Sequence, residues 1–398
     1  MAAITIYIDD QEIQAEEGST ILEAAEAAGI DIPTLCHHPA LSNWGSCRMC
    51  LVEVEPRGQL QPSCTFPVSP GLRVHTRSEK VIRARKFVLQ LLFSERNHFC
   101  MYCESSGQCE LQDLAYEYGL DHWLYSHNRP NRGMPVDASR PYFIMDHNRC
   151  ILCRRCIRAC AEVSAVHTLG IAQRGARSMV VADLDLPFGS SSCISCGTCL
   201  QVCPTGALID RKSAYMGIDE QLEATNSVCF GCSVGCGIVV RTRAQRLVRG
   251  EGNWDAPVNG GLLCRLGRFE PVYVTAPRVD SPLRRVDGQL RPCAWEESLS
   301  LVAEKLIGAS TEKGVAALLS SRATNEELDS AVAAFSPIAG RDGIGLLDGA
   351  MPEAAPGELV SVADVEQADA IVTLGVDLAD EHEVVAGFVR RAIDRGAR

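Results

Sequence analysis

The spacing of the cysteines constrains this chain more than any other feature of its sequence. Nineteen of its 20 cysteines lie between Cys36 and Cys264, and only Cys293 follows. Within that stretch, two runs of four have identical internal spacing and are displaced from each other by 43 positions: Cys150, Cys153, Cys156 and Cys160, then Cys193, Cys196, Cys199 and Cys203. Four coincident offsets indicate a duplicated module in which the cysteines share one role.

Three roles are open to so many cysteines: disulfides, metal ligands or free thiols. The opening residues, MAAITIYIDD, have no basic stretch and no apolar core, so they do not form a secretory signal, and no apolar run is long enough to span a bilayer. We therefore expect a cytoplasmic chain without direct membrane insertion, where disulfides are rare and clustered cysteines bind metal. The net charge of −12 argues against nucleic acid as a partner.

The duplicated runs follow the pattern of two-cluster ferredoxins, in which the fourth cysteine of each run binds the other cluster. The spacing predicts two [4Fe–4S] clusters, one held by Cys150, Cys153, Cys156 and Cys203 and the other by Cys193, Cys196, Cys199 and Cys160. Ala161 stands where a proline commonly follows the fourth cysteine. A pair of four-thiolate zinc sites is the alternative, although zinc motifs seldom use this triple spacing.

Two further sets each supply four thiols. The set that follows the predicted N-terminal strands and helix suits a β-grasp ferredoxin domain with a [2Fe–2S] cluster: Cys36, Cys47, Cys50 and Cys64. The last set has two close spacings and one distant cysteine, and we assign it a [4Fe–4S] cluster: Cys229, Cys232, Cys236 and Cys264. Zinc stays an alternative at both sites.

The remaining set is incomplete, because Cys100, Cys103 and Cys109 supply only three thiolates. A tetrahedral iron site needs a fourth ligand, and we expect His98 to fill that position since imidazole binds iron. Cys293 has no partner at a ligand spacing and is expected to be a small buried hydrophobe. No other residue stands in a catalytic motif, so we expect no catalytic residue and no substrate chemistry in this chain alone.

Periodicity and capping signals predict the regular elements. At the N-terminus they are strands at 4–8 and 11–15, a helix from Thr20 through Ala28 with Glu23 in its capping box, and a helix over 78–93. Residues 97–145 have little periodicity. Beyond Arg268 the pattern alternates: a buried strand at 314–319, a helix opened by Thr324 and Glu327, a strand at 370–375 and a helix over 382–394.

With these sets in place, the chain resembles one family. CHHPALSNWGSCRMCLVEV, HFCMYCESSGQCELQD, the duplicated run, and CFGCSVGCG with LLCRLGRF are similar to the large iron–sulfur subunit of respiratory complex I and its soluble relatives. Those relatives are the α subunits of NAD-dependent formate dehydrogenases and the iron–sulfur subunits of NAD(P)-linked hydrogenases. The resemblance agrees with the ligand sets and implies a histidine ligand for the third cluster, which the family often places where this chain has Arg96.

From about Ser227 the chain is similar to the start of molybdopterin oxidoreductases. Leu266 stands where the family has a lysine that relays electrons toward the pterin, and no metal-binding cysteine follows Cys293. The resemblance then implies that residues 275–398 are a shortened, non-catalytic α/β remnant without molybdenum. The full expectation is an α+β multidomain chain with these divisions: 1–77 (β-grasp), 78–145 (histidine-ligated cluster), 146–222 (two-cluster ferredoxin-like), 223–274 (last [4Fe–4S]) and 275–398 (remnant).

The expected function is electron transfer through one [2Fe–2S] and four [4Fe–4S] clusters, with no flavin in this chain. The resemblance implies two kinds of partner: a flavoprotein (FMN or FAD) subunit that oxidises NAD(P)H, and a hydrogenase, a formate dehydrogenase or a ferredoxin. Two alternatives remain, a subunit or fragment of a molybdenum or tungsten formate dehydrogenase and an iron–sulfur sensor or scaffold.

Overall fold

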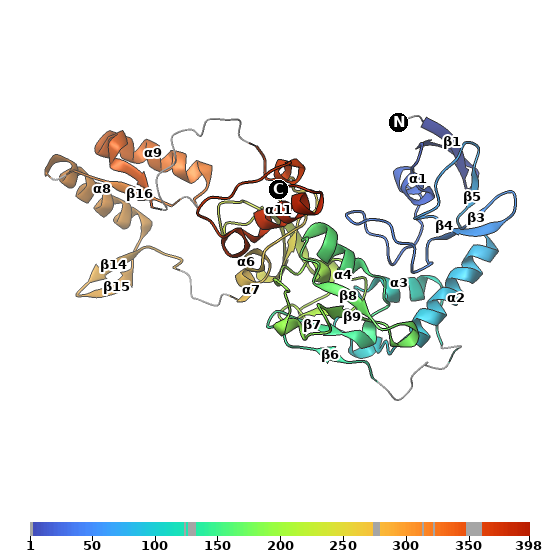
Figure 1. Cartoon of the computed structure of the whole chain (residues 1–398). Coiled ribbons are helices and arrows are strands. Elements are labelled where there is room, and N and C mark those ends of the chain that lie inside the picture. Colours follow the sequence, from blue (N-terminus) through green and yellow to red (C-terminus); the bar gives the residue numbers. More distant parts are fainter. Residues whose placement is uncertain are drawn as a thin grey trace. The chain divides into compact units, whose positions relative to one another are not determined.

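The computed structural model describes most of the chain, whose elements are drawn in Figure 1. The described residues are 3–122, 125, 133–273, 279–312, 314–320, 323–347 and 360–398. They form two compact units: unit 1 consists of Met1–Ser227, Cys236–Val272 and Ser361–Arg398, and unit 2 consists of Val228–Gly235 and Tyr273–Val360. Among the described residues, no helix is long and apolar enough to cross a membrane.

Unit 1 begins with a mixed five-stranded sheet and one helix, α1 (Ile21–Ala27). In spatial order the strands are β2 (Gln11–Glu16), β1 (Ala3–Ile8), β5 (Arg73–His75), β3 (Leu51–Val54) and β4 (Gln59–Pro62). β1 is antiparallel to β2 and parallel to β5. The predicted capping box is present, since Thr20 and Glu23 exchange side-chain and backbone hydrogen bonds. Both predicted strands and this helix are therefore confirmed.

The core of this first sheet follows from the alternation of its strands. Ile6 and Ile8 point to one face of β1 and are fully buried, and Leu22 and Ala25 of α1 cover them. Each buried isoleucine or leucine contributes about 2 kcal/mol. A stable sheet therefore supports the loop that connects α1 to β3, where Cys36, Cys47 and Cys50 lie.

Two helices follow the sheet. α2 (Glu79–Glu95) confirms the helix predicted over 78–93, and Ser78 caps it by accepting the N–H of Val81. α3 (Glu110–Glu117) packs against α2 and was not predicted, because turn-forming residues surround its short apolar pattern. Arg85 of α2 is buried between them and donates to the Tyr118 hydroxyl (2.9 Å) and the Leu51 carbonyl (2.8 Å).

The duplicated cysteine runs lie in a compact module of short elements. A three-stranded sheet has the order β10 (Leu208–Asp210), β7 (Phe143–Asp146) and β6 (Val136–Asp137), and a hairpin is formed by β8 (Leu169–Ala172) and β9 (Met179–Ala182). The helices are α4 (Arg155–Arg158), which continues into a π-helical turn at Ala159–Val163, and α5 (Thr198–Gln201). Most of the predicted ligand residues therefore lie on loops that short helices and strands fix in place.

Unit 1 is completed by a second three-stranded sheet and the C-terminal helices. The sheet has the order β11 (Glu223–Val228), β12 (Gly237–Arg243) and β13 (Arg246–Gly252), and the helices are α6 (Arg265–Arg268), α7 (Glu270–Tyr273), α10 (Leu378–Glu381) and α11 (Glu383–Asp394). α11 confirms the helix predicted over 382–394. It packs on the duplicated module, where Arg390 donates to the Ser164 carbonyl at 3.2 Å.

Unit 2 contains two small sheets and two longer helices. Its elements are β14 (Leu283–Val286), β15 (Gln289–Pro292), α8 (Trp295–Glu312), β16 (Ala317–Leu319), α9 (Asn325–Ala339) and β17 (Ile344–Leu346). Thr324 and Glu327 form the predicted capping box of α9. The strand predicted at 314–319 is reduced to β16, which pairs in parallel with β17 and leaves Leu318 mostly exposed.

Two expectations about the last third of the chain are wrong. Residues 370–375 do not form a strand: Val372 and Leu374 are more than 80% exposed, and the backbone bond of Ile371 goes to the Arg398 carbonyl rather than to a neighbouring strand. An apolar run forms a strand only where a partner offers a ladder of hydrogen bonds. Cys293 is only half-buried, and its sulfur lies 3.0 Å from the Ser298 hydroxyl.

Candidate iron–sulfur sites

The first cysteine set is buried and comes together from the loop between α1 and β3 and from the residues just after β4. Cys36, Cys47, Cys50 and Cys64 are each at most 7% exposed, and the sulfurs of Cys50 and Cys64 lie 3.3 Å apart. Hydrogen bonding with the Cys47 thiol and the Cys64 thiol holds the pKa of Cys36 well below its ordinary value. The contact with Cys64 lowers the pKa of Cys50 to about 7. The same hydrogen bonds raise the pKa of Cys47 and Cys64, so two of the thiols favour the thiolate and two favour the thiol. Four buried sulfurs in contact fit the donor set that an iron–sulfur group needs.

The backbone around this loop is bent to admit its thiols. Arg48 has a φ of 61° between Cys47 and Cys50, a conformation that non-glycine residues rarely adopt. Arg48 thus lies between two predicted ligands. Strained backbone of this kind clusters at functional sites, which agrees with two sulfurs that face a common group.

The second site has one histidine and three cysteines around one cavity. His98, Cys100, Cys103 and Cys109 all line it, and Gly206 closes it from the duplicated module. Burial raises the pKa of Cys109 to about 12. The site therefore favours neutral thiols until a cationic group offsets the cost of burying thiolate charge. The structure thus brings His98 to the same cavity as the three thiols, as the ligand count requires.

The duplicated runs repeat in backbone conformation as well as in sequence. Leu152 and Ser195, which are 43 positions apart, both have φ near 60°, and the N–H of each donates to the sulfur two residues before it at 3.4 Å. Arg154 and Gly197 form a second such pair with positive φ. Amide groups aimed at sulfur stabilise thiolate and are a means of tuning a cluster. The two loops are therefore built alike around their sulfurs.

The fourth cysteine of each run lies beside the other run. Burial raises the pKa of Cys153, and the neighbouring Cys203 charge raises it further. Burial likewise raises the pKa of Cys193 to about 11, with Cys196 and Cys160 adding to it. Cys203 thus neighbours the first run and Cys160 the second. This exchange is the one that two-cluster ferredoxins use.

The last set is divided between the two units. Cys229 and Cys232 belong to unit 2, whereas Cys236 and Cys264 belong to unit 1. Cys264 begins α6, and its sulfur accepts the N–H of Gly267 at 3.3 Å. The assignment of these four residues to one [4Fe–4S] cluster stays a prediction.

A site for a single metal ion, such as zinc, brings its ligand side chains closer together than a cluster site does. Within the described part of the chain, no group of three or more His, Cys, Asp or Glu side chains is close enough to hold one metal ion. A cluster spreads its thiolate ligands over several iron atoms and does not require that spacing.

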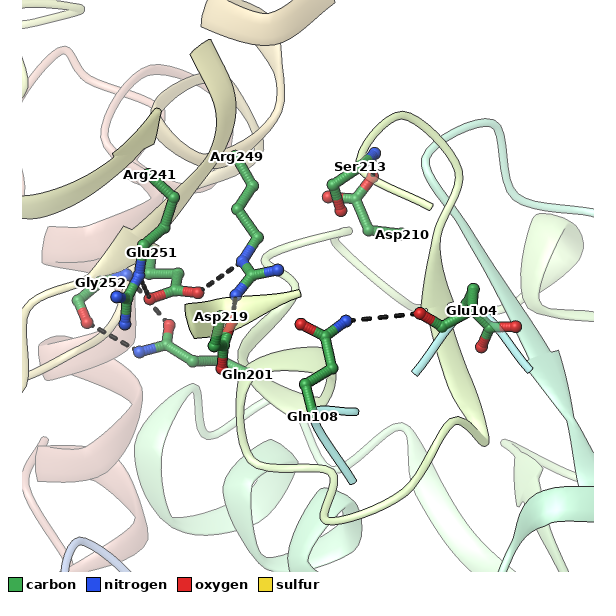
Figure 2. A network of polar contacts seen from close by, with 10 residues as sticks. All are labelled: Glu104, Gln108, Gln201, Asp210, Ser213, Asp219, Arg241, Arg249, Glu251 and Gly252. Carbon is green, nitrogen blue, oxygen red and sulfur yellow. Dashed lines mark hydrogen bonds and ion pairs between the residues drawn. The ribbon is translucent and has the colours of Figure 1, made fainter. Parts of the chain in front are cut away.

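A network of charged and polar residues joins the duplicated module to the second sheet (Figure 2). Gln201 of α5 exchanges two hydrogen bonds with the backbone of Gly252, at 2.8 and 3.0 Å. Arg249 of β13 pairs with Glu251 at 2.7 Å and with Asp219. The network borders a cavity of 170 Å³ that Cys203 also lines. It therefore fixes α5, which contains Cys199, against the β12–β13 hairpin.

Buried arginines are functional candidates that reasoning from the sequence missed. Five are at most 5% exposed: Arg85, Arg96, Arg155, Arg158 and Arg268. Each is hydrogen-bonded to a carbonyl or a carboxylate on another segment, such as Arg268 to the Cys196 carbonyl at 2.6 Å. A usable signal was present, since all of them except Arg85 stand within four residues of a predicted ligand cysteine. Composition alone assigns charged residues to the surface.

Family models match the chain in five consecutive segments. A 2Fe-2S iron–sulfur cluster binding domain matches residues 1–79, and the NADH-ubiquinone oxidoreductase-G iron–sulfur binding region matches 85–123. The ferredoxin-like domain of NADH-quinone oxidoreductase subunit 3 matches 141–209. The molybdopterin oxidoreductase Fe4S4 domain matches 222–275, and molybdopterin oxidoreductase matches 278–398. These matches and the converging thiols define an iron–sulfur protein with [2Fe–2S] and [4Fe–4S] binding domains.

Individual relatives agree with the family models. The G 2 subunit of NADH-quinone oxidoreductase from Rhizobium meliloti is 36% identical over 328 residues, covering 82% of this chain and 38% of that protein. The alpha subunit of NADPH-Fe(3+) oxidoreductase from Geobacter sulfurreducens is 32% identical over 328 residues, covering 81% of this chain and 38% of that protein. A chain in the crystal structure of an NAD+-reducing [NiFe]-hydrogenase in the H2-reduced state is 40% identical with a TM-score of 0.51; the match covers 54% of this chain and 91% of that one.

The chain therefore belongs to the family of G-type subunits of NADH-quinone oxidoreductase and their relatives in NAD-linked hydrogenases. It spans less than half the length of these curated relatives. The resemblance inferred from the cysteine motifs is confirmed, as are the mixed α/β architecture and the order of the cluster-binding regions. The finer domain boundaries and the individual ligand assignments stay predictions.

Proposed function

We propose that this chain is the iron–sulfur electron-transfer subunit of an NAD(P)-linked oxidoreductase complex. The observation that carries the proposal is a single apolar core that contains cysteines of three candidate sites. Leu35, Leu89, Phe93 and Leu111 pack in this core with sulfurs of the first, second and third sets: Cys36, Cys47, Cys109 and Cys153. Neighbouring sites inside one water-excluding core are what electron conduction requires, whereas a sensor or scaffold needs one accessible cluster.

The series of neighbouring buried cysteine sites continues through the duplicated module. Cys156, from the first run, and Cys199, from the second, are buried neighbours, and the charge of Cys199 is among the causes that raise the pKa of Cys156 after burial itself. The sites thus follow one another from the first sheet to α5. We infer one [2Fe–2S] and four [4Fe–4S] clusters, held by the ligand sets given above.

The chain's own residues bind these groups and exclude water from them. Thiols and one imidazole supply the ligands, backbone N–H groups point at the sulfurs, and buried side chains keep the sites dry. Bound clusters would supply one-electron chemistry. A nicotinamide donor delivers two electrons as hydride, so a flavin must mediate, and we infer that an FMN- or FAD-containing partner supplies it. The acceptor would be a hydrogenase, a formate dehydrogenase or a ferredoxin.

Metal analysis and reconstitution test this proposal. Anaerobically purified protein should contain about 18 iron atoms, with matching sulfide and negligible zinc. The isolated chain should not oxidise NADH or NADPH with an artificial acceptor, whereas the copurified complex should. Stoichiometric zinc would contradict the ligand assignment. Rapid bleaching of the clusters by NAD(P)H in a flavin-free preparation would contradict the assignment of the flavin to a partner.

A second function is favoured by one observation, the match of residues 278–398 to molybdopterin oxidoreductases. On that alternative, this chain would be the first part of a molybdenum or tungsten enzyme. We prefer the electron-transfer function, because Leu266 stands where the resemblance leads us to expect a lysine that relays electrons. Stoichiometric molybdenum or tungsten with a bound pterin would reverse this preference.

A further inference from the structure

Three side chains on one short segment face the loop of the first cysteine set. Arg154, Arg158 and Glu162 are spaced by four residues, and the segment is helical from Arg155 through Val163. Residues four apart share one side of a helix. In the sequence they alternate with Cys156 and Cys160, two predicted [4Fe–4S] ligands. Arg158 and Glu162 lie on the helical part and Arg154 is its left-handed N-cap residue, and all three side chains reach from the duplicated module to the loop of the first set.

Arg158 forms the centre of this contact. Its guanidinium donates to the carbonyl oxygens of Cys36 and Ser42, more than a hundred positions earlier in the chain. The side chain is only 5% exposed. Guanidinium groups keep their charge in proteins, and their fixed fork of donors suits two carbonyls at once. Arg158 therefore joins a backbone carbonyl of a predicted [2Fe–2S] ligand to the duplicated module.

The outer residues of the segment hold the same loop. The Glu162 carboxylate accepts the Ser42 N–H at 2.7 Å and the Ser42 hydroxyl at 2.6 Å. The Arg154 guanidinium lies 5.0 Å from the centre of the Trp44 ring, within the range of a cation–π contact. We name Arg154, Arg158 and Glu162 the loop clamp. It grips the Cys36–Trp44 stretch through its backbone and one aromatic ring.

The charge of Arg158 requires a compensating anion. Among the described residues its guanidinium bonds to carbonyls and forms no ion pair, and its Nε is buried without a hydrogen-bond partner, as are those of Arg85 and Arg155. Burying an unpaired cation is costly, so such groups persist where an anionic group sits beside them. Thiolates gathered at Cys36 and at the duplicated runs would supply that negative charge once they bind iron. Arg158 thus brings a buried positive charge into hydrogen-bond contact with the carbonyl of Cys36, a predicted ligand.

We propose that the loop clamp positions the [2Fe–2S] ligand loop against the two-cluster module and that Arg158 is its buried countercharge. The proposal rests on the proposed function, because it assumes the ligand set of the first site. None of the three side chains is a ligand, so their role is positioning. A fixed positive charge beside a cluster favours the reduced form, which carries one more negative charge. Arg158 therefore raises the midpoint potential of the [2Fe–2S] centre.

Two substitutions of Arg158 distinguish the effect of its positive charge from the effect of its side-chain shape. In the copurified complex, Arg158→Gln should lower the equilibrium constant for reduction of the [2Fe–2S] centre on the order of tenfold, or about 59 mV for one electron. Arg158→Lys retains the charge and should recover most of that shift. Arg174→Gln removes an exposed arginine of the same module and serves as the matched control. Titration monitored by electron paramagnetic resonance measures all four proteins.

Glu162→Gln and Trp44→Ala test the grip on the loop. Both should leave iron content unchanged and increase hydrogen exchange in residues 36–47, relative to wild type and Arg174→Gln. If Arg158→Gln loses the [2Fe–2S] centre, the clamp is tested instead by the potential of Arg158→Lys and by the hydrogen exchange of Glu162→Gln and Trp44→Ala. Wild-type potentials in Arg158→Gln, or unchanged exchange in Glu162→Gln, would overturn the clamp alone. A wild-type complex without any [2Fe–2S] signal would overturn the proposed function together with the clamp.

Discussion

Gly206 offers the sharpest test of the histidine-containing site. It follows Cys203 in the duplicated module and faces the cavity that Cys103 lines. A β-carbon built at this position would lie 2.6 Å from the Cys103 sulfur and 3.0 Å from Glu104 Oε1 and Ser105 Oγ. The substitution Gly206→Ala therefore places a methyl group against a predicted iron ligand without altering any ligand itself.

The size of the effect follows from these distances. Non-bonded heavy atoms prefer separations of about 3.5–4.0 Å, so the sulfur must move by about 1 Å. Metal–ligand distances tolerate about 0.2 Å, which is much less than that displacement. Overpacking of this kind costs about 1–3 kcal/mol of folding free energy. We expect Gly206→Ala to lower the thermal stability and to lose or alter the cluster of this site alone.

Iron analysis, electron paramagnetic resonance and thermal unfolding measure this outcome. Gly206→Ala should lose about four iron atoms and one cluster signal, while the remaining signals persist. Gly170→Ala is the matched control, because a β-carbon at Gly170 has no atom within 4 Å. A Gly206→Ala protein with full iron, an unchanged spectrum and the melting temperature of Gly170→Ala would refute the placement of this site.

Substitutions at three further positions have defined outcomes. His98→Ala should lose the cluster of its site or degrade it to a three-iron form, and His98→Cys should keep four irons at a lower potential, both visible in spectra of the reduced protein; an unchanged His98→Ala spectrum would mean another ligand. Arg390→Gln should lower the potential of the Cys160 cluster in a redox titration, because the Arg390 cation packs near the sulfurs of Cys196 and Cys160 and favours the more negative, reduced form. Glu55→Gln should remove a stabilising contribution of a few tenths of a kcal/mol that the half-exposed pair with His75 makes. The hydrogen bond that His75 donates to the Glu55 carboxylate raises the pKa of His75. The contribution is therefore present below pH 6.5 and is lost as the pH rises through the raised pKa, which melting curves at pH 6 and pH 8 would detect.

The candidate sites were more predictable than the fold around them. Ligand spacing is a local property, because a loop that wraps a cluster must present its thiols at short, fixed intervals. The duplication at 43 positions predicts an exchange of the fourth cysteines, and Cys203 and Cys160 lie near the opposite runs, although the exchange itself stays a prediction. The capping boxes of α1 and α9 were equally local and were found at the predicted residues.

Features that depend on distant partners could not be predicted in this way. The apolar run at 370–375 has the composition of a strand, but among the described residues its backbone bonds to Arg398 instead of a neighbouring strand. The loop clamp could not be predicted either, because its contacts join residues that are far apart in the sequence. Arg158 has the composition of a surface residue, and only the tertiary structure brings the Cys36 carbonyl to it. Charge in a sequence does not by itself indicate exposure.

The buried arginines resolve a conflict that follows from the ligand loops themselves. Loops with left-handed residues between cysteines cannot satisfy their carbonyls with regular secondary structure, and a buried carbonyl without a partner is costly. Arg96 donates to the carbonyls of His147 and Ser178, Arg158 to that of Cys36, and Arg268 to that of Cys196. Asparagine or serine could also donate, but neither would offset the negative charge that thiolate ligands bring into the core. The guanidinium does both, so the same side chains that complete the backbone hydrogen bonds also make the buried clusters electrostatically tolerable.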